Sequence, residues 1–138
     1  MREYVRTQTA VLLRRFAFQV NRAALSGDAE SVHDLRVAIR RFSRCLSTFS
    51  QFYPDGAGRK IRRELADLRD LAGNVRDRHI ALELLAAAGI SARSAVFMRL
   101  DEESRKAGRD LLNEAKRWKA SGFSRKWRIK LGLLRPGS

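Results

Sequence analysis

Apolar residues recur at intervals of three and four along most of the chain, and no stretch alternates apolar and polar positions as a strand would. Short turns between long helices favour antiparallel neighbours, so the pattern predicts an all-α fold, an antiparallel four-helix bundle. We expect one domain over residues 1–134 and a frayed tail at 135–138. The expected long helices cover residues 3–25, 31–53, 59–88 and 92–119, and a short last one falls within 123–134.

Turn and cap residues separate these helices. Ser31 and Asp34 have the spacing of a capping box, which predicts that the second helix begins near Ser31. Gly89 is expected to end the third helix and Ser91 to cap the fourth. The inward-facing positions of the last two long helices include Leu82, Val96 and Leu100. The remaining breaks are predicted at Ser26-Gly27-Asp28 and Pro54-Asp55-Gly56.

Charge narrows the choice of partner. The chain carries 29 Lys and Arg against 15 Asp and Glu, a net charge of +14. Self-repulsion on that scale weakens the compact state unless an anion offsets it. Arg outnumbers Lys, and the guanidinium fork suits bidentate contacts with phosphate. A single cysteine, Cys45, together with the lack of an apolar membrane span or signal peptide, predicts a cytoplasmic protein.

The positive charge of the second helix forms a line opposite its core stripe. His33, Arg36, Arg40 and Arg44 fall within about 80° of one another on a helical wheel and span about 16 Å. Arg41 flanks this line, and no acid interrupts it. An ordinary solvated face mixes charges of both signs, so this line favours a binding face.

Two further lines follow on the third and fourth helices. Arg62, Arg69 and Arg76 repeat every seven residues, with the small residues Ala66 and Gly73 between them to leave room for a ligand or another backbone. Acids of the third helix that lie elsewhere on the wheel include Glu64, Asp67 and Asp70. The line on the fourth helix consists of Arg105, Arg109 and Lys116. We therefore expect a polyanion to bind along these residues, although each line alone is also typical of a solvated face.

Other functions fit the residues less well. We expect no catalysis, no cofactor and no metal, because no catalytic histidine pair, nucleotide loop or metal-binding cluster is present. Sequence-nonspecific nucleic-acid binding is the main alternative, since any phosphate backbone suits such charge. Against it, the basic lines carry no aromatic residues for base stacking, and Trp118, Phe123 and Trp127 are more typical of core and cap. A membrane-surface or granule-coat bundle acting by charge alone is a third interpretation.

Residues 32–42, VHDLRVAIRRF, resemble the signature of CHAD domains, helical domains named for a histidine. Residues 72–77, AGNVRD, resemble the Leu-Gly-x-x-Arg-Asp element of that family. The resemblance implies non-catalytic binding of inorganic polyphosphate by helical basic surfaces, at polyphosphate granules. The ligand residues that it implies are His33, Arg36, Arg40, Arg41, Arg44 and Arg76, followed by Arg105 and Arg109.

The chain departs from the family pattern in three ways. Ala72 stands where the family has Leu, and His79 stands in the place of its second acid. Both family elements occur once here, whereas a full family member resembles two such bundles related by an internal two-fold. The chain thus looks like half of a two-bundle architecture. It is either a half-length member that forms a homodimer, which we expect, or a degenerate or truncated one.

Overall fold

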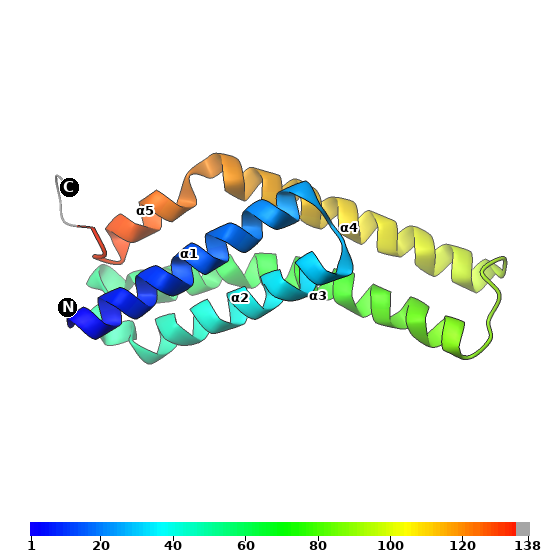
Figure 1. The fold of residues 1–138 in the computed structure, drawn as a ribbon, viewed down its shortest axis with the longest axis horizontal. Helices are drawn as coiled ribbons and strands as arrows, with labels where there is room; N and C mark the ends of the chain where they lie inside the picture. The colour runs from blue at the N-terminus through cyan, green and yellow to red at the C-terminus, as the bar shows by residue number, and fades with distance from the viewer. Residues whose placement is uncertain (135–138) are drawn as a thin grey trace.

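The computed structural model describes residues 1–134, which form five α-helices and no strand (Figure 1). The all-α prediction is confirmed. The predicted frayed tail, 135–138, lies outside the described residues. The helices are α1 (Glu3–Leu25), α2 (Ala29–Thr48), α3 (Ala57–Ala87), α4 (Ala95–Ser121) and α5 (Phe123–Lys130), and two 3-10 turns, Ser50–Phe52 and Pro54–Gly56, join α2 to α3.

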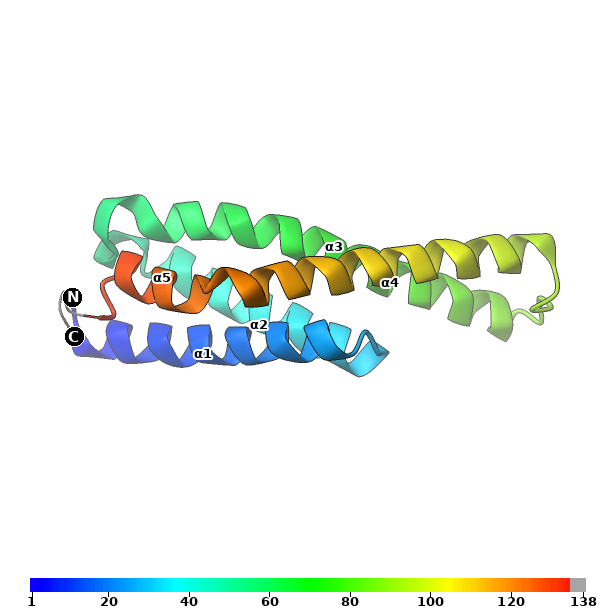
Figure 2. The ribbon, with the colours of Figure 1, turned by 90° about the horizontal axis from the view of Figure 1, so that it is seen from above.

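The four long helices pack in a ring. α1 contacts α2 and α4, and α3 contacts the same two helices from the other side. α5 continues the direction of α4 after a bend at Gly122, whose left-handed backbone (φ 68°) ends one helix and begins the next. α3 and α4 are longer than their neighbours and project past the α1–α2 turn as a two-helix hairpin (Figures 1 and 2).

An aromatic cluster fills the centre of the bundle. Phe16 of α1 is fully buried, with its ring centroid 5.8 Å from that of Phe42, 5.5 Å from that of Phe123 and 6.0 Å from that of Trp127. Trp118 of α4 meets Phe16 edge-on at 5.8 Å. Aromatic pairs in this range stabilise a core beyond the area they bury. The cluster therefore ties α5 and the end of α4 to α1 and α2.

One buried polar cluster joins α1 to the end of α2. The Thr9 hydroxyl donates to the carbonyl oxygen of Val5 at 2.6 Å, so the Tyr53 hydroxyl, 2.8 Å away, donates to Thr9. The Sγ of Cys45 lies 3.6 Å from Thr9 Oγ1 and 3.7 Å from Tyr53 Oη. Burial raises the pKa of Tyr53. The cluster thus satisfies two buried hydroxyl groups inside an otherwise apolar core.

Two helix starts differ from the sequence prediction. α2 begins at Ala29 because Asp28 caps it, accepting a hydrogen bond from the Ser31 backbone N–H at 2.8 Å. Ser31 is therefore buried inside the first turn, and the predicted capping box is wrong. Its other member, Asp34, instead accepts a hydrogen bond from Arg22 of α1 at 2.8 Å, which raises the pKa of Arg22.

α4 begins at Ala95 rather than near residue 92. The Ser94 hydroxyl caps it by accepting from the Phe97 N–H at 3.2 Å, so the predicted cap at Ser91 is wrong. The Ser91 hydroxyl accepts from the Arg93 N–H within the turn. Gly89 follows the end of α3, as predicted. Its left-handed backbone (φ 77°) allows the Ile90 N–H to donate to the carbonyl oxygen of Leu85. The turn predicted at Pro54-Asp55-Gly56 is also confirmed.

Three predicted core positions are not core in this chain. Leu82 of α3 and Leu100 of α4 are only half-buried, and Val96 of α4 is 50% exposed. All three lie in the projecting hairpin, where α1 and α2 no longer cover α3 and α4 (Figure 1). Their periodicity is that of a bundle interior, but the helices that would cover them are absent at that level.

Candidate functional site

A basic groove runs between α2 and α3. It consists of two adjoining surface cavities of about 240 Å³ and 530 Å³, which share Ser43 and Arg69. We call it the α2–α3 groove. Its basic residues are His33, Arg36, Arg40 and Arg44 from α2, and Arg59, Arg62, Arg63 and Arg69 from α3. None of the residues that line either cavity is Asp or Glu.

Local packing explains why two basic helices lie side by side. Leu35, Ile39 and Phe42 of α2 are buried, which turns the opposite line of bases outward. Next to the turn that joins α2 to α3, the start of α3 lies very close to α2. A Cβ on Gly58 would lie 2.9 Å from Cδ2 of Tyr53 and 3.2 Å from the carbonyl oxygen of Leu46. Apolar burial thus holds the two basic lines against their mutual repulsion.

Few acids compensate the charge of the groove. Among the ion pairs of residues 1–134, only one involves a groove residue, Arg69 with Asp70 at 3.5 Å, and both side chains are largely exposed. Arg62 is half-buried, and its Nε is shielded from solvent without a hydrogen-bond acceptor in the described part of the chain. A buried donor without a partner costs free energy, which an anion in the groove would recover.

The acids of α3 lie on its other side. Glu64, Asp67 and Glu114 line a cavity of about 420 Å³ beside α4 and α5, together with Arg117 and other residues of both signs. Asp67 and Asp70 also line the neighbouring cavity of about 510 Å³. This agrees with the positions that the helical wheel gave these acids. Along the length of the groove, α3 therefore separates its charges, with Arg62 and Arg69 toward α2 and with Glu64 and Asp67 toward α4.

The structure divides the predicted site residues into groups. The groove contains six of them, which are His33, Arg36, Arg40, Arg44, Arg62 and Arg69. Arg76 continues the line on α3, seven residues beyond Arg69, but lines neither groove cavity. Arg41 lies on the α1 side of α2, in a separate cavity of about 160 Å³ with Arg15 and Asp34.

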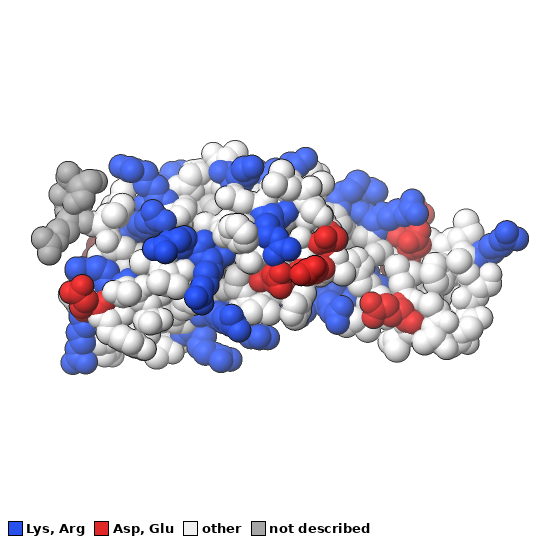
Figure 3. Space-filling view, viewed as in Figure 1, with Lys and Arg blue, Asp and Glu red and all other residues white. Residues whose placement is uncertain are grey.

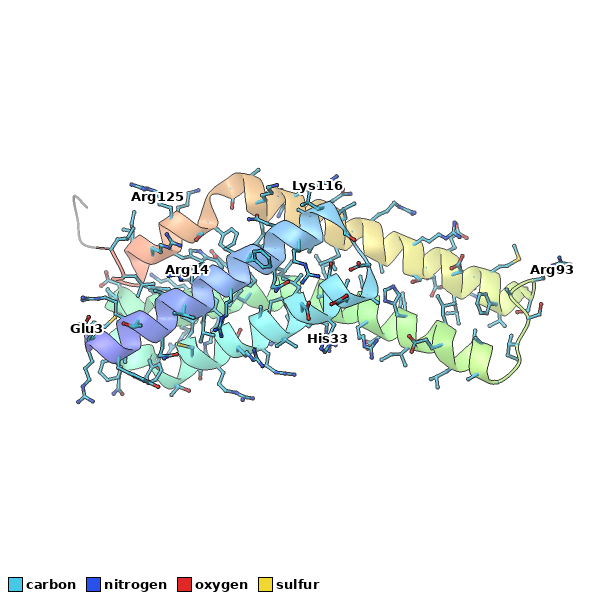
Figure 4. The ribbon with its side chains drawn as sticks, in the orientation of Figure 1. Glu3, Arg14, His33, Arg93, Lys116 and Arg125 are labelled. Carbon is cyan, nitrogen blue, oxygen red and sulfur yellow. The ribbon has the colours of Figure 1, made fainter. Side chains whose placement is uncertain are left out.

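The predicted line on α4 lies apart from the groove. Arg105 pairs with Asp101 at 3.1 Å, and Arg109 and Lys116 are exposed on α4, which packs against α1 and α3. In Figure 4, Lys116 lies along the edge of the molecule opposite to His33. The structure therefore does not bring all the predicted residues onto one face.

A helix that began near Ser31, as predicted, would have His33 in its first turn, but the structure does not. With α2 beginning at Ala29, His33 is the fifth residue of the helix rather than part of its first turn. The carboxylate of Asp28 already occupies the helix N-terminus, and hydrogen bonds from Ser31 lower its pKa. The helix dipole therefore gives His33 little help in binding an anion, and its place beside Arg36 and Arg40 in the groove is what matters.

The sequence prediction missed several groove residues. Arg59 and Arg63 flank Arg62 on α3, and Ser43, Ser47 and Thr48 add hydroxyl groups from α2. The sequence did contain a sign of Arg59 and Arg63, a dense run of basic residues at the start of α3. In an antiparallel pair of helices this run lies opposite the end of α2. The small residue Ala66 lines the groove, while a Cβ at Gly73 would meet no atom within 4 Å, so no backbone approaches there.

Residues 1–134 hold no cluster of three or more His, Cys, Asp or Glu side chains arranged to bind a metal ion. Within the same residues, no helix is long and apolar enough to cross a membrane.

Comparison with known proteins identifies the family of the chain. No curated protein and no solved structure matches the chain. The sequence model of the CHAD domain matches residues 9–137 of the 138 residues. The match covers both elements of the resemblance, VHDLRVAIRRF on α2 and AGNVRD on α3, and nearly the whole bundle. The chain therefore belongs to the CHAD domain family.

Proposed function

We propose that this chain binds inorganic polyphosphate, without catalysis, in the α2–α3 groove. The observation that carries the proposal is a groove lined by seven arginines and one histidine and by no acid. Guanidinium groups form short, charge-assisted hydrogen bonds with phosphate oxygens, often two at a time. Successive phosphates of a linear chain would meet successive arginines, so each contact adds to the same binding event.

The shape of the groove supports a linear ligand. The bases of α2 extend from His33 to Arg44, about 16 Å at the rise of an α-helix, and those of α3 extend about 15 Å from Arg59 to Arg69. The two lines run alongside each other because α2 and α3 pack as antiparallel neighbours. Hydroxyl groups of Ser43, Ser47 and Thr48 add neutral donors on the α2 side. A chain of phosphates would thus be held from both sides.

Membership in the CHAD family supports the choice of polyphosphate over other polyanions, and we propose that the chain acts at polyphosphate granules in the cytoplasm. Nucleic acid is the main competitor because it also offers a line of phosphates. The structure weakens that alternative, since Trp118, Phe123 and Trp127 pack around Phe16 and no Phe, Tyr or Trp side chain lines the groove to stack on a base.

The test is a competition at near-physiological salt. Labelled long-chain polyphosphate is bound to the protein and challenged with excess duplex DNA, RNA or heparin. We expect unlabelled polyphosphate to displace the label at far lower phosphate concentration than the three competitors do. Displacement by DNA or RNA as readily as by polyphosphate would contradict the proposal and make nucleic acid the better candidate.

Charge reversal then tests the location. Replacing Arg36 and Arg40 together by Glu places two acids in the groove and should abolish polyphosphate binding without unfolding the bundle, because neither side chain belongs to the core. The matched control reverses Arg105 and Arg109 on α4, which changes the net charge equally. Equal losses from both pairs would show that net charge, rather than the groove, governs binding.

A further inference from the structure

The projecting hairpin is the least covered part of the molecule. The last buried residue of α3 is Val75 and the first buried residue of α4 is Ser104, so residues 76–103 lie beyond the core. We call these residues the arm. Its α3 portion, 76–87, is 12 residues long, or about 18 Å. Figures 1 and 2 show the arm extending past the α1–α2 turn with no other helix beside it.

In the arm, the helix faces that point into the bundle interior continue, but no other helices cover them. A separation of eleven residues is about three helical turns, so residues eleven apart face the same direction. Ala107 is 4% exposed in the bundle, whereas Val96, eleven residues earlier, is 50% exposed. In the same way Val75 is fully buried, but Ala86, eleven residues later, is exposed. Positions that are core in the bundle are thus open to solvent in the arm.

The exposed apolar side chains of the arm belong to both helices and to the turn between them. Leu84 is 65% exposed and Met98 is 60% exposed, and Ile90 in the turn is exposed as well. Leu82, Phe97 and Leu100 are half-buried beside them. In Figure 3 this end of the molecule shows wide uncharged areas. Exposed apolar side chains gathered on two adjacent helices are typical of an interface.

The charge of the arm also sets it apart. Residues 76–103 carry five acids and four bases, a net charge of −1, whereas the rest of the chain carries 10 acids and 25 bases, a net charge of +15. Two copies that met through their basic bodies would repel each other strongly. Two copies that meet through their arms keep those bodies apart and bring together surfaces of mixed sign.

We propose that the arm is the docking surface for a second copy of this chain, with the two arms packed about a two-fold axis. Each arm supplies two antiparallel helices whose inward-facing apolar positions are exposed to solvent. Two such pairs make a four-helix arrangement of the same kind as α1–α4. A two-fold interface needs no second type of surface, because each residue that contacts another is contacted by it in turn. The single set of family elements already predicts a homodimer, and the arm gives that dimer a specific interface.

The test is the mass of the protein in solution without any polyanion, so that its outcome does not depend on the groove. We expect light scattering at tens of micromolar to give twice the 15.7 kDa of one chain. The measurement is made in 0.5 M NaCl, where repulsion between the basic bodies is largely screened. A monomer under these conditions would overturn the proposal.

Substitution locates the interface. The double variant Leu84→Glu, Val96→Glu should be a monomer with unchanged helical circular dichroism, because both side chains are at least half exposed in one copy. The control is Phe18→Glu on α1, also an exposed apolar residue, at 59%. It introduces the same kind of charge and should remain a dimer. A dimer that survives the double variant, or dissociates equally with Phe18→Glu, would refute the arm as its interface.

Discussion

The salt dependence of polyphosphate binding offers the most quantitative test of the α2–α3 groove. Each positive charge that neutralises a phosphate releases condensed counterions, so the logarithm of the binding constant falls linearly with the logarithm of salt concentration. The slope is about −0.7 per neutralised phosphate for a single-stranded polyanion, which we take as the coefficient for polyphosphate. The groove holds seven arginines. Full engagement therefore predicts a slope of about −5.

The perturbation is the double variant Arg36→Gln, Arg40→Gln. It removes two of the seven arginine charges, keeps polar side chains of similar length and leaves the core untouched. The predicted slope falls to about −3.5. Between 50 and 200 mM salt, the native protein should then lose about 10³-fold in affinity and the variant about 10²-fold.

Fluorescence anisotropy with labelled polyphosphate at four or more salt concentrations measures both slopes. The matched control is Arg105→Gln, Arg109→Gln, which removes the same charge from α4. Its slope should stay near that of the native protein, because neither residue lines the groove and Arg105 is paired with Asp101. An equal decrease in both variants would show that phosphates also bind along α4, and a flat salt response would refute the electrostatic mechanism itself.

Three further predictions concern the stability of the fold. Phe16→Ala should lower the free energy of unfolding by about 3–5 kcal/mol in urea titrations. The control Phe18→Ala, at an exposed position of the same helix, should change it by less than about 0.5 kcal/mol. Similar losses from both variants would contradict the central role of the aromatic cluster. Tyr53→Phe should cost about 1 kcal/mol at pH 7, because the hydroxyl donates to Thr9. Burial raises the pKa of Tyr53 above its ordinary 10.0, so the stability of the native protein should be full below pH 10 and decline as the pH rises through the folded value; thermal melts of Tyr53→Phe should lack this decline. Asp28→Ala should lower the melting temperature at pH 7 and lose that difference in acid, because hydrogen bonds from Ser31 hold the pKa of Asp28 below 3.8 and its contribution disappears only as the pH falls through that lower value. A constant difference down to the most acidic melts would show that the cap acts without its charge.

The sequence predicted the helices well because their apolar periodicity is a local property that packing then preserves. Helix starts were less accurate, since two neighbouring residues often offer similar caps. Both Asp28 and Ser31 are good N-cap residues, and the choice of Asp28 follows from the burial of Ser31 against the core and the pairing of Asp34 with Arg22. Neither fact is visible without the packing of α1 on α2.

The site was only partly predictable for a related reason. A helical wheel gives the direction of a residue on its own helix, but it does not say which helix lies beside it. His33, Arg40 and Arg69 were found from spacing alone, and packing brings them together. Arg109 has an equally good position on its wheel, yet α4 packs against α1 and α3, away from the basic line of α2. The same limit explains why Val96 was predicted as core: periodicity records an interior face without saying what covers it.

The charge pattern of α3 connects the two proposals. Arg62, Arg69 and Arg76 recur every seven residues, and the next position of that series, Glu83, is an acid. The change of sign falls inside the arm, beyond the last buried residue of α3. A phosphate chain that extended from the groove along this series would therefore meet a repulsive charge inside the arm, which leaves the outer part of the arm free for a second copy. If both proposals hold, polyphosphate and the dimer interface occupy different lengths of one helix, so substitutions in the groove should change binding without changing mass, and substitutions in the arm should change mass while leaving the charge of each groove intact.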